Sequence, residues 1–126
     1  SCPKLTDAVD LKTKGIACKN NCQVLAGGDA KLVALKAYTD KNGGPSWRLT
    51  EAYPPTSQHS SPCHYNGRCV DLNPLDKSAA NYDKMCVALK AVGLVNFLNE
   101  SVTTQNCGVG KTTTFGTGAH LHVILF

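Results

Sequence analysis

Residues 81–98 read NYDKMCVALKAVGLVNFL, a helical pattern followed directly by an apolar strand pattern. The apolar side chains of the first part recur at the spacing of one helical face: Tyr82, Met85, Cys86, Leu89 and Val92. Gly93 marks the C-terminal end of this helix, and residues 94–98 form a compact apolar strand. The change from helix to strand favours an α+β fold, in which two main helices pack on an antiparallel or mixed sheet.

The flanking segments extend this pattern. A first helix is predicted from Asp29, which can cap it, to the stop at Gly43, Gly44 and Pro45. WRLTEAY at residues 47–53 alternates as a strand does, residues 56–67 form a polar loop, and residues 69–72 make a short strand. The tail 119–126 alternates with a period of two. One face carries His120, His122, Ile124 and Phe126, and the other carries Leu121, Val123 and Leu125.

The length and the cysteine pattern indicate one domain with a stapled extension. A chain of 126 residues, 42% hydrophobic and 17% charged, can bury a single core. Residues 1–28 hold three of the seven cysteines and end at a Gly-Gly break. We therefore expect a disulfide-stapled N-terminal extension over residues 1–28 and the main domain over residues 29–126.

Charge and cysteine content bound the location and the partners. The net charge is +4, but the lysines are scattered and the chain has two arginines, which argues against nucleic-acid binding. No uncharged apolar run approaches the roughly 20 residues of a membrane-spanning helix. Seven cysteines are typical of an oxidising compartment, so we expect a secreted protein, at the cell surface or outside the cell. The chain begins at Ser1 without an apolar leader, which fits a signal peptide that has already been removed.

Several residues could bind a metal ion. A tight turn at Asn66 and Gly67 can bring His64 and Asp71 together, and Gly67 is expected to need a positive φ or a close backbone approach. His122 could add a third ligand from the terminal strand. Such a pair of ligands is a weak signal by itself, because isolated histidines are most often ordinary surface or packed residues. Glu51 and Glu100 are the candidates for carrying a proton.

The stretch from Leu49 to Ser101, followed by AHLH at 119–122, resembles a known zinc-binding core. This core is shared by hedgehog amino-terminal signalling domains and zinc metallopeptidases of the D-Ala-D-Ala carboxypeptidase type. HYNGRCVD at 64–71 is similar to the family element H-x-x-G-R-A-x-D. The resemblance implies that the Zn²⁺ ligands are His64, Asp71 and His122. It also implies a catalytic Glu100, with His120 beside the bound water or the substrate carbonyl.

Other positions match the family less closely. His59 is similar in place to a histidine near the metal in hedgehog domains. Pro54 and Pro55 stand where the peptidases have an arginine for the substrate carboxylate, and residues 101–118 form an insertion before His120. Only Glu51 matches the acidic cluster with which hedgehog domains bind calcium, so calcium binding is not carried over from the resemblance. Arg68 could contact a substrate carboxylate, pair with Glu51, or lie on the surface.

The cysteines leave alternatives open. Cys63 and Cys69 could bond and clamp the turn that presents His64, or could bind zinc together with it. Cys18 and Cys22 lie one helical turn apart, so a bond between them would need local distortion, and more distant partners are equally possible. Because seven is odd, one thiol is free, modified or bonded to another chain.

The predicted function is zinc-assisted amide hydrolysis by a secreted peptidase-like domain. The resemblance implies as substrate a peptide ending in a D-amino acid, or a related peptidoglycan-like cell-wall peptide. The alternative is a non-catalytic extracellular structural or assembly module with the same fold. It would self-associate into a filament or surface array through the C-terminal strand HVILF or the odd cysteine. A third possibility, a hedgehog-like receptor ligand, rests on the resemblance alone.

Overall fold

The computed structural model describes residues 5–55, 66–111 and 118–126. Within these residues two α-helices combine with two antiparallel sheets, so the predicted α+β class is confirmed. The elements in chain order are β1 (Ala8–Asp10), the 3-10 helix η1 (Leu11–Lys14), β2 (Gln23–Leu25), α1 (Gly28–Lys41), β3 (Trp47–Glu51), β4 (Cys69–Pro74), α2 (Ala79–Ala91), β5 (Phe97–Glu100) and β6 (His120–Ile124).

The larger sheet has the strand order β3-β4-β6-β5, and each neighbouring pair is antiparallel. β6 therefore pairs on both sides. The prediction that the C-terminal strand could pair with a neighbouring subunit's sheet is wrong, because β6 has no free edge. The edge strands are β3 and β5, and the N-terminal segment bonds to the outer side of β3. There Lys19 N donates to Leu49 O at 2.8 Å, and Leu49 N donates to Ala17 O at 2.9 Å.

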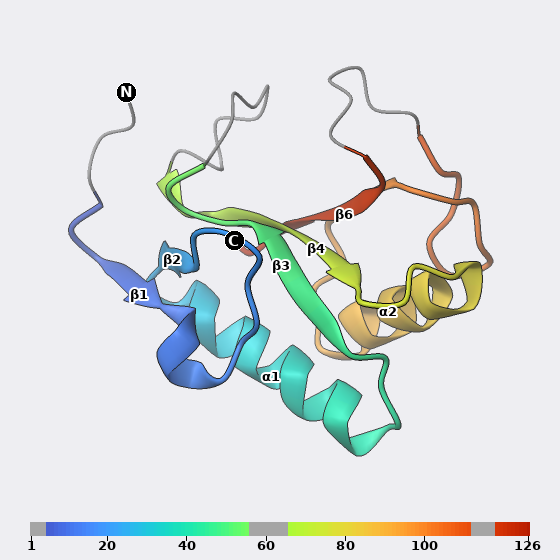
Figure 1. The fold of residues 1–126 in the computed structure, drawn as a ribbon, viewed down its shortest axis with the longest axis horizontal. Coiled ribbons are helices and arrows are strands. Elements are labelled where there is room, and N and C mark those ends of the chain that lie inside the picture. The colour runs from blue at the N-terminus through green and yellow to red at the C-terminus, as the bar shows by residue number, and fades with distance from the viewer. Residues whose placement is uncertain (1–4, 56–65, 112–117) are drawn as a thin grey trace.

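Both helices lie on one side of this sheet, and the hydrophobic core fills the space between them (Figure 1). The core side chains come from α1, α2 and the inward face of the strands: Leu32, Leu35, Met85, Leu89, Leu49, Leu72, Leu121 and Val123. A buried hydrogen bond of 2.9 Å from Trp47 Nε1 to Thr39 Oγ1 joins β3 to α1. Because the helices cover one face, the opposite face of the sheet is where the histidines lie.

The observed element boundaries differ from the predicted ones by a few residues. Ser78 caps α2 by accepting from Asn81 N at 3.2 Å, so the helix begins before Asn81. Leu94 N donates to Leu89 O at 2.8 Å, which closes the C-terminal turn of α2 and delays β5 until Phe97. Asp29 lies inside the first turn of α1, where its side chain accepts from Gly27 N at 3.0 Å.

The N-terminal segment shares the main core. Its β1–β2 hairpin lies beside the start of α1 (Figure 1), and Leu11, Ile16 and Val24 are buried in the same cluster as the helices. The disulfide Cys18–Cys22 staples this segment, with a Cα–Cα distance of 5.7 Å. Cys18 and Cys22 do not lie in a helix, and Cys18 forms a β-bridge to Leu49 on β3.

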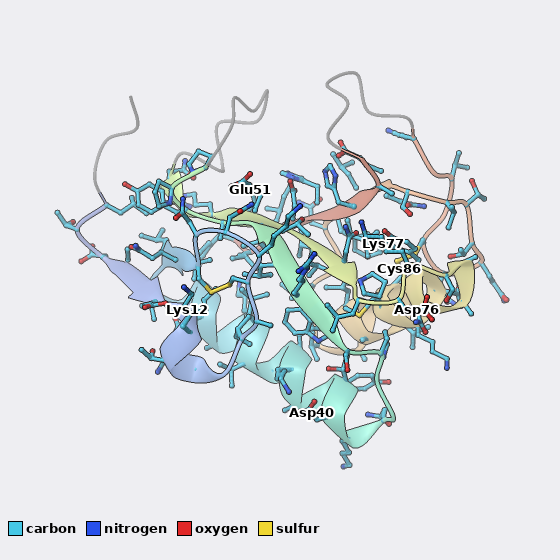
Figure 2. All side chains as sticks on the ribbon, viewed as in Figure 1. Lys12, Asp40, Glu51, Asp76, Lys77 and Cys86 are labelled. Carbon is cyan, nitrogen blue, oxygen red and sulfur yellow. A yellow bond between two sulfur atoms is a disulfide. The ribbon has the colours of Figure 1, made fainter. Side chains whose placement is uncertain are left out.

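A second disulfide, Cys86–Cys107, joins α2 to the segment after β5, and Cys69 is also disulfide-bonded. Figure 2 labels Cys86, which belongs to α2. Cys2 and Cys63 lie outside the described residues, and so do the predicted Cys63–Cys69 pair and the odd thiol. The disulfides are compatible with an oxidising compartment. Within the described ranges, no helix has the length and apolar character needed to cross a membrane.

Candidate functional site

The polar face of the sheet is built by the alternation of β4 and β6. Leu121 and Val123 of β6 enter the core, so His120 and His122 project from the opposite face, as predicted. Residues directly opposite each other in antiparallel strands share a face. The register therefore arranges the polar side chains in two rows across the sheet.

The first row consists of Glu51, Asp71, His122 and Leu98. Asp71 is opposite His122 on β6, and His122 is opposite Leu98 on β5. A register shift between Leu49 and Glu51 adds a residue to β3 and sets Glu51 opposite Asp71. The strict alternation expected for residues 47–53 grouped Glu51 with Leu49, whereas this irregularity places it on the polar face. Figure 2 shows Glu51 above the sheet, away from α1.

The second row consists of Arg48, Asn73, His120 and Glu100. Arg48 is opposite Asn73, and Glu100 is opposite His120. Leu72 of β4 is opposite Leu121 of β6. Because the strands are antiparallel, the next residue of β4, Asn73, is opposite His120. The two rows are adjacent, because their members lie two residues apart on β4, β5 and β6.

Asp71 and His122 make direct contact in the first row. His122 Nδ1 lies 3.0 Å from Asp71 Oδ1, and the two side chains are only 8% and 6% exposed. Since an ionised carboxylate only accepts, the hydrogen bond is donated by Nδ1. A buried carboxylate that is bonded in this way has its position fixed by the sheet register.

His120 links the two rows. Its Nδ1 lies 3.1 Å from Gly118 O, and because a carbonyl only accepts, Nδ1 is the donor. Its Nε2 contacts Glu100 Oε2 and lies 3.5 Å from Asp71 Oδ2. Glu100 and Asp71 therefore lie on either side of one nitrogen atom. The chain between Glu100 and His120 does not separate these two side chains.

Asn73 supports the second row, and the sequence analysis missed it. Tyr82 OH donates to Asn73 Oδ1 at 2.8 Å, and Asn73 Nδ2 donates to Ala119 O at 2.8 Å. Burial raises the pKa of the Tyr82 phenol, which favours the neutral donor form. Asn73 thus ties the residue before His120 to α2. Asn73 lies two residues after Asp71 on β4, and alternate residues of a strand share a face. This spacing could have identified Asn73 from the sequence.

The donor atoms of Asp71 and His122 fit a zinc ion. Carboxylate oxygen and imidazole nitrogen are ordinary zinc ligands, and two ligand atoms of a tetrahedral zinc ion lie about 3.3 Å apart. The observed 3.0 Å between Oδ1 and Nδ1 is close to this spacing. Within the described residues, no group of three or more His, Cys, Asp or Glu side chains could hold a metal ion. His64, the expected third ligand, lies outside them, as does His59.

The two arginines have different surroundings. Within the part of the chain that the structure describes, the Arg48 side chain makes no hydrogen bond or ion pair, while its main chain pairs with Asn73 in the sheet. The Arg68 guanidinium lies 5.5 Å from the centre of the Phe126 ring. Of the three possibilities considered for Arg68, a pair with Glu51 is not formed among the described residues.

The chain was compared with models of known protein families and with curated proteins. No family model matches the chain, and neither does any curated protein.

Proposed function

We propose that the chain is a secreted, zinc-dependent peptidase-like domain that hydrolyses an amide bond. The observation that carries the proposal is the contact between Asp71 and His122, with Glu100 and His120 in the adjacent row. Together these residues provide two zinc-ligand atoms and a carboxylate–imidazole pair on one face of a rigid sheet. Zinc hydrolysis needs both parts.

Asp71 and His122 would hold the metal, and His64 is the proposed third ligand. A bound zinc ion supplies Lewis acidity toward a substrate carbonyl. The sheet fixes the Asp71 and His122 donor atoms before binding, which lowers the cost of assembling the site. Metal binding requires an unprotonated His122 Nδ1, so zinc would replace the hydrogen bond to Asp71.

Glu100 is the proposed proton carrier. Its side chain is 28% exposed, compared with 6% for Asp71, so Glu100 can reach both solvent and a substrate. In hydrolysis, water adds its hydroxyl to the carbonyl carbon, the C–N bond breaks, and the remaining proton goes to the leaving nitrogen. Glu100 would accept that proton from water and deliver it to the amine.

His120 would orient Glu100 and the substrate. The bond from its Nδ1 to Gly118 O fixes the ring, and its Nε2 then faces the reacting groups. The substrate proposed by resemblance is a peptide ending in a D-amino acid, such as a peptidoglycan-like cell-wall peptide. The Arg48 side chain, which makes no ion pair with any described residue, lies at the end of the second row and would attract an anionic group of that substrate.

Zinc content tests the metal centre. We expect the purified protein to bind one zinc ion per chain, measured by elemental analysis after dialysis, and His122→Ala to lose it. Asp76→Ala is the matched control, since Asp76 precedes α2 and makes no side-chain contact with the two rows. Zinc loss in the control, or retention in His122→Ala, would argue against the assigned ligands.

Hydrolysis of a D-Ala-D-Ala peptide tests the catalytic role. Glu100→Gln keeps the size of the side chain but cannot carry the proton, and general acid–base groups contribute about 10²–10⁴-fold to rates. We expect kcat to fall within this range while zinc content stays unchanged. Equal kcat values for Glu100→Gln and the unmodified protein would refute the assignment.

The alternative remains a non-catalytic assembly module that pairs with a second copy of itself. With β6 enclosed, β5 is the remaining edge for this role. Lys111 N already bonds Asn99 O on its outer side, so the open part lies toward Phe97 and Val95, of which Val95 is 69% exposed. Sedimentation velocity of the unmodified protein and Val95→Lys distinguishes the cases. Assembly that Val95→Lys abolishes, in a protein without hydrolytic activity, would favour this alternative.

A further inference from the structure

The segment after β5 is tied to α2 by a dense set of contacts. We name residues 101–111 the brace. Cys107 is disulfide-bonded to Cys86, and Asn106 donates to Asp83 through its main-chain N at 2.8 Å and its side-chain Nδ2 at 2.9 Å. Lys90 Nζ donates to Asn106 O at 2.6 Å. The tip of the brace is therefore fixed to a helix that packs on the core.

The brace also closes on itself. Thr104 and Gly108 exchange two main-chain hydrogen bonds, of 3.2 and 3.0 Å, and Gly110 N donates to Thr103 Oγ1 at 2.8 Å. A Cβ at Gly110 would overlap the carbonyl oxygen of Ser101, so the start and the end of the brace lie in direct contact. Because the brace is compact and is fixed to α2, it holds the end of β5 at a defined position relative to α2.

Asn99 is the residue through which the brace holds β5. It is 5% exposed, and its Nδ2 donates to Val102 O at 2.9 Å and to Gly108 O at 3.3 Å. Its Oδ1 accepts from Ser101 N at 3.0 Å, and its main-chain O accepts from Lys111 N at 2.9 Å. All these bonds connect Asn99 to the brace.

Asn99 and Glu100 are adjacent in the chain, and their side chains lie on opposite faces of the sheet. Asn99 is opposite Leu121, whose side chain is in the core, whereas Glu100 is opposite His120 on the polar face. Since one main chain carries both side chains, the bonds that fix Asn99 also fix the main chain from which Glu100 projects. Without them, Glu100 would lie at the free end of an edge strand.

We propose that Asn99 is a positioning residue, which with the brace holds the Glu100 carboxylate against His120 Nε2. The proposal rests on the proposed function only in giving Glu100 a catalytic role. The contact itself can be tested without a substrate. If the proposed function also holds, Asn99→Ala should lower kcat and leave KM nearly unchanged, because the substrate does not touch Asn99.

The direct test is the ¹⁵N chemical shift of His120 Nε2 at one fixed pH. The reference is Glu100→Gln, which removes the carboxylate charge from the contact. We expect Asn99→Ala to move the His120 Nε2 signal in the same direction as Glu100→Gln. Gly110→Ala forces the two ends of the brace apart and so disturbs the bonds of Asn99 while keeping its side chain. It should move the signal in the same direction to a smaller extent.

Thr39→Val is the matched control. It removes the acceptor for Trp47 Nε1 and destabilises the fold on the α1 side, remote from β5. We expect its His120 Nε2 signal to stay at the unmodified position despite a lower melting temperature. An unchanged signal in folded Asn99→Ala would overturn the proposal. Should Asn99→Ala fail to fold, an unchanged signal in Gly110→Ala would overturn it.

The outcome is separable from that of the proposed function. If Glu100→Gln retains full hydrolysis, the catalytic role of Glu100 fails, while the His120 signal still decides whether Asn99 positions it. If hydrolysis depends on Glu100 but the His120 Nε2 signal is unchanged in Asn99→Ala and Gly110→Ala, only the positioning proposal fails.

Discussion

Glu100 and Asp71 contact the same nitrogen of His120 but differ in their access to solvent. Asp71 is nearly enclosed and bonded to His122, so its position is fixed by the sheet. Glu100 is partly exposed at the end of β5 and can meet an incoming molecule. In the proposed function, this difference in exposure supports a ligand role for Asp71 and a proton-transfer role for Glu100.

Arg48 provides a prediction at the scale of one residue. A hydrogen bond to a charged group is worth about 1.5–3 kcal/mol, so Arg48→Gln should raise KM for a peptide with a free carboxylate by roughly tenfold or more. The kcat should change little, because Arg48 is separated from Glu100 by the width of β4 and β6. Steady-state kinetics measures both constants.

Arg68→Gln is the control, since its guanidinium stacks on Phe126. An amidated peptide completes the comparison. If Arg48→Gln and Arg68→Gln raised KM equally, or if the amidated peptide bound as well as the free acid, Arg48 would have no special role.

The turn before β4 gives a prediction at the scale of an element. Gly67 has φ +71°, and a Cβ there would lie 2.7 Å from Leu25 N, so both reasons expected for this glycine are confirmed. Gly43 has φ +78° but open space around it. A left-handed backbone costs a non-glycine residue about 1–2 kcal/mol, and overpacking adds about 1–3 kcal/mol.

Gly67→Ala should therefore lower the free energy of unfolding by at least about 1 kcal/mol more than Gly43→Ala. Urea unfolding followed by circular dichroism measures the difference. Equal losses in the two variants would mean that the β2 backbone moves freely away from the turn.

The brace gives an acid-dependent prediction. Hydrogen bonds from Asn106 lower the pKa of the Asp83 carboxyl. A lowered pKa in the folded state adds stability above the unfolded-state value of about 3.9, and this stability is lost as the pH falls through the lower folded value. Asp83→Asn should cost about 1 kcal/mol at pH 7 and progressively less below about pH 4.

Urea midpoints of Asp83→Asn and the unmodified protein, measured across this range, provide the test. Asp76→Asn is the control, because Asp76 precedes α2 and does not bond to Asn106 of the brace. A difference that grows on acidification would contradict the assigned direction of the pKa shift.

The elements were predictable to different degrees. The helical spacing of residues 82–92 and the alternation of residues 119–126 identified α2 and the two faces of β6, because each pattern is local. The irregularity in β3 was not predictable, since an added residue leaves no trace in a simple alternation. The position of Glu51 opposite Asp71 therefore needed the structure.

At the scale of the whole molecule, the hydrophobic core and the candidate site lie on opposite faces of the sheet. One face packs on α1 and α2 (Figure 1), and the register places the two polar rows on the other face. The strand order brings together segments that are remote in sequence. The residues alone made Asp71 and Glu100 separate candidates, and only the resemblance grouped them with His120 in one site. Their contacts depend on which strands are neighbours, and periodicity within one strand does not contain that information.

The central claim is a zinc ion held by Asp71 and His122 on the polar face. X-ray absorption at the zinc edge of the metal-loaded protein tests it most directly. The expected result is a first shell of nitrogen and oxygen atoms at about 2.0–2.1 Å, which His122→Ala removes. A sulfur shell at about 2.3 Å, or no stoichiometric zinc, would contradict the claim.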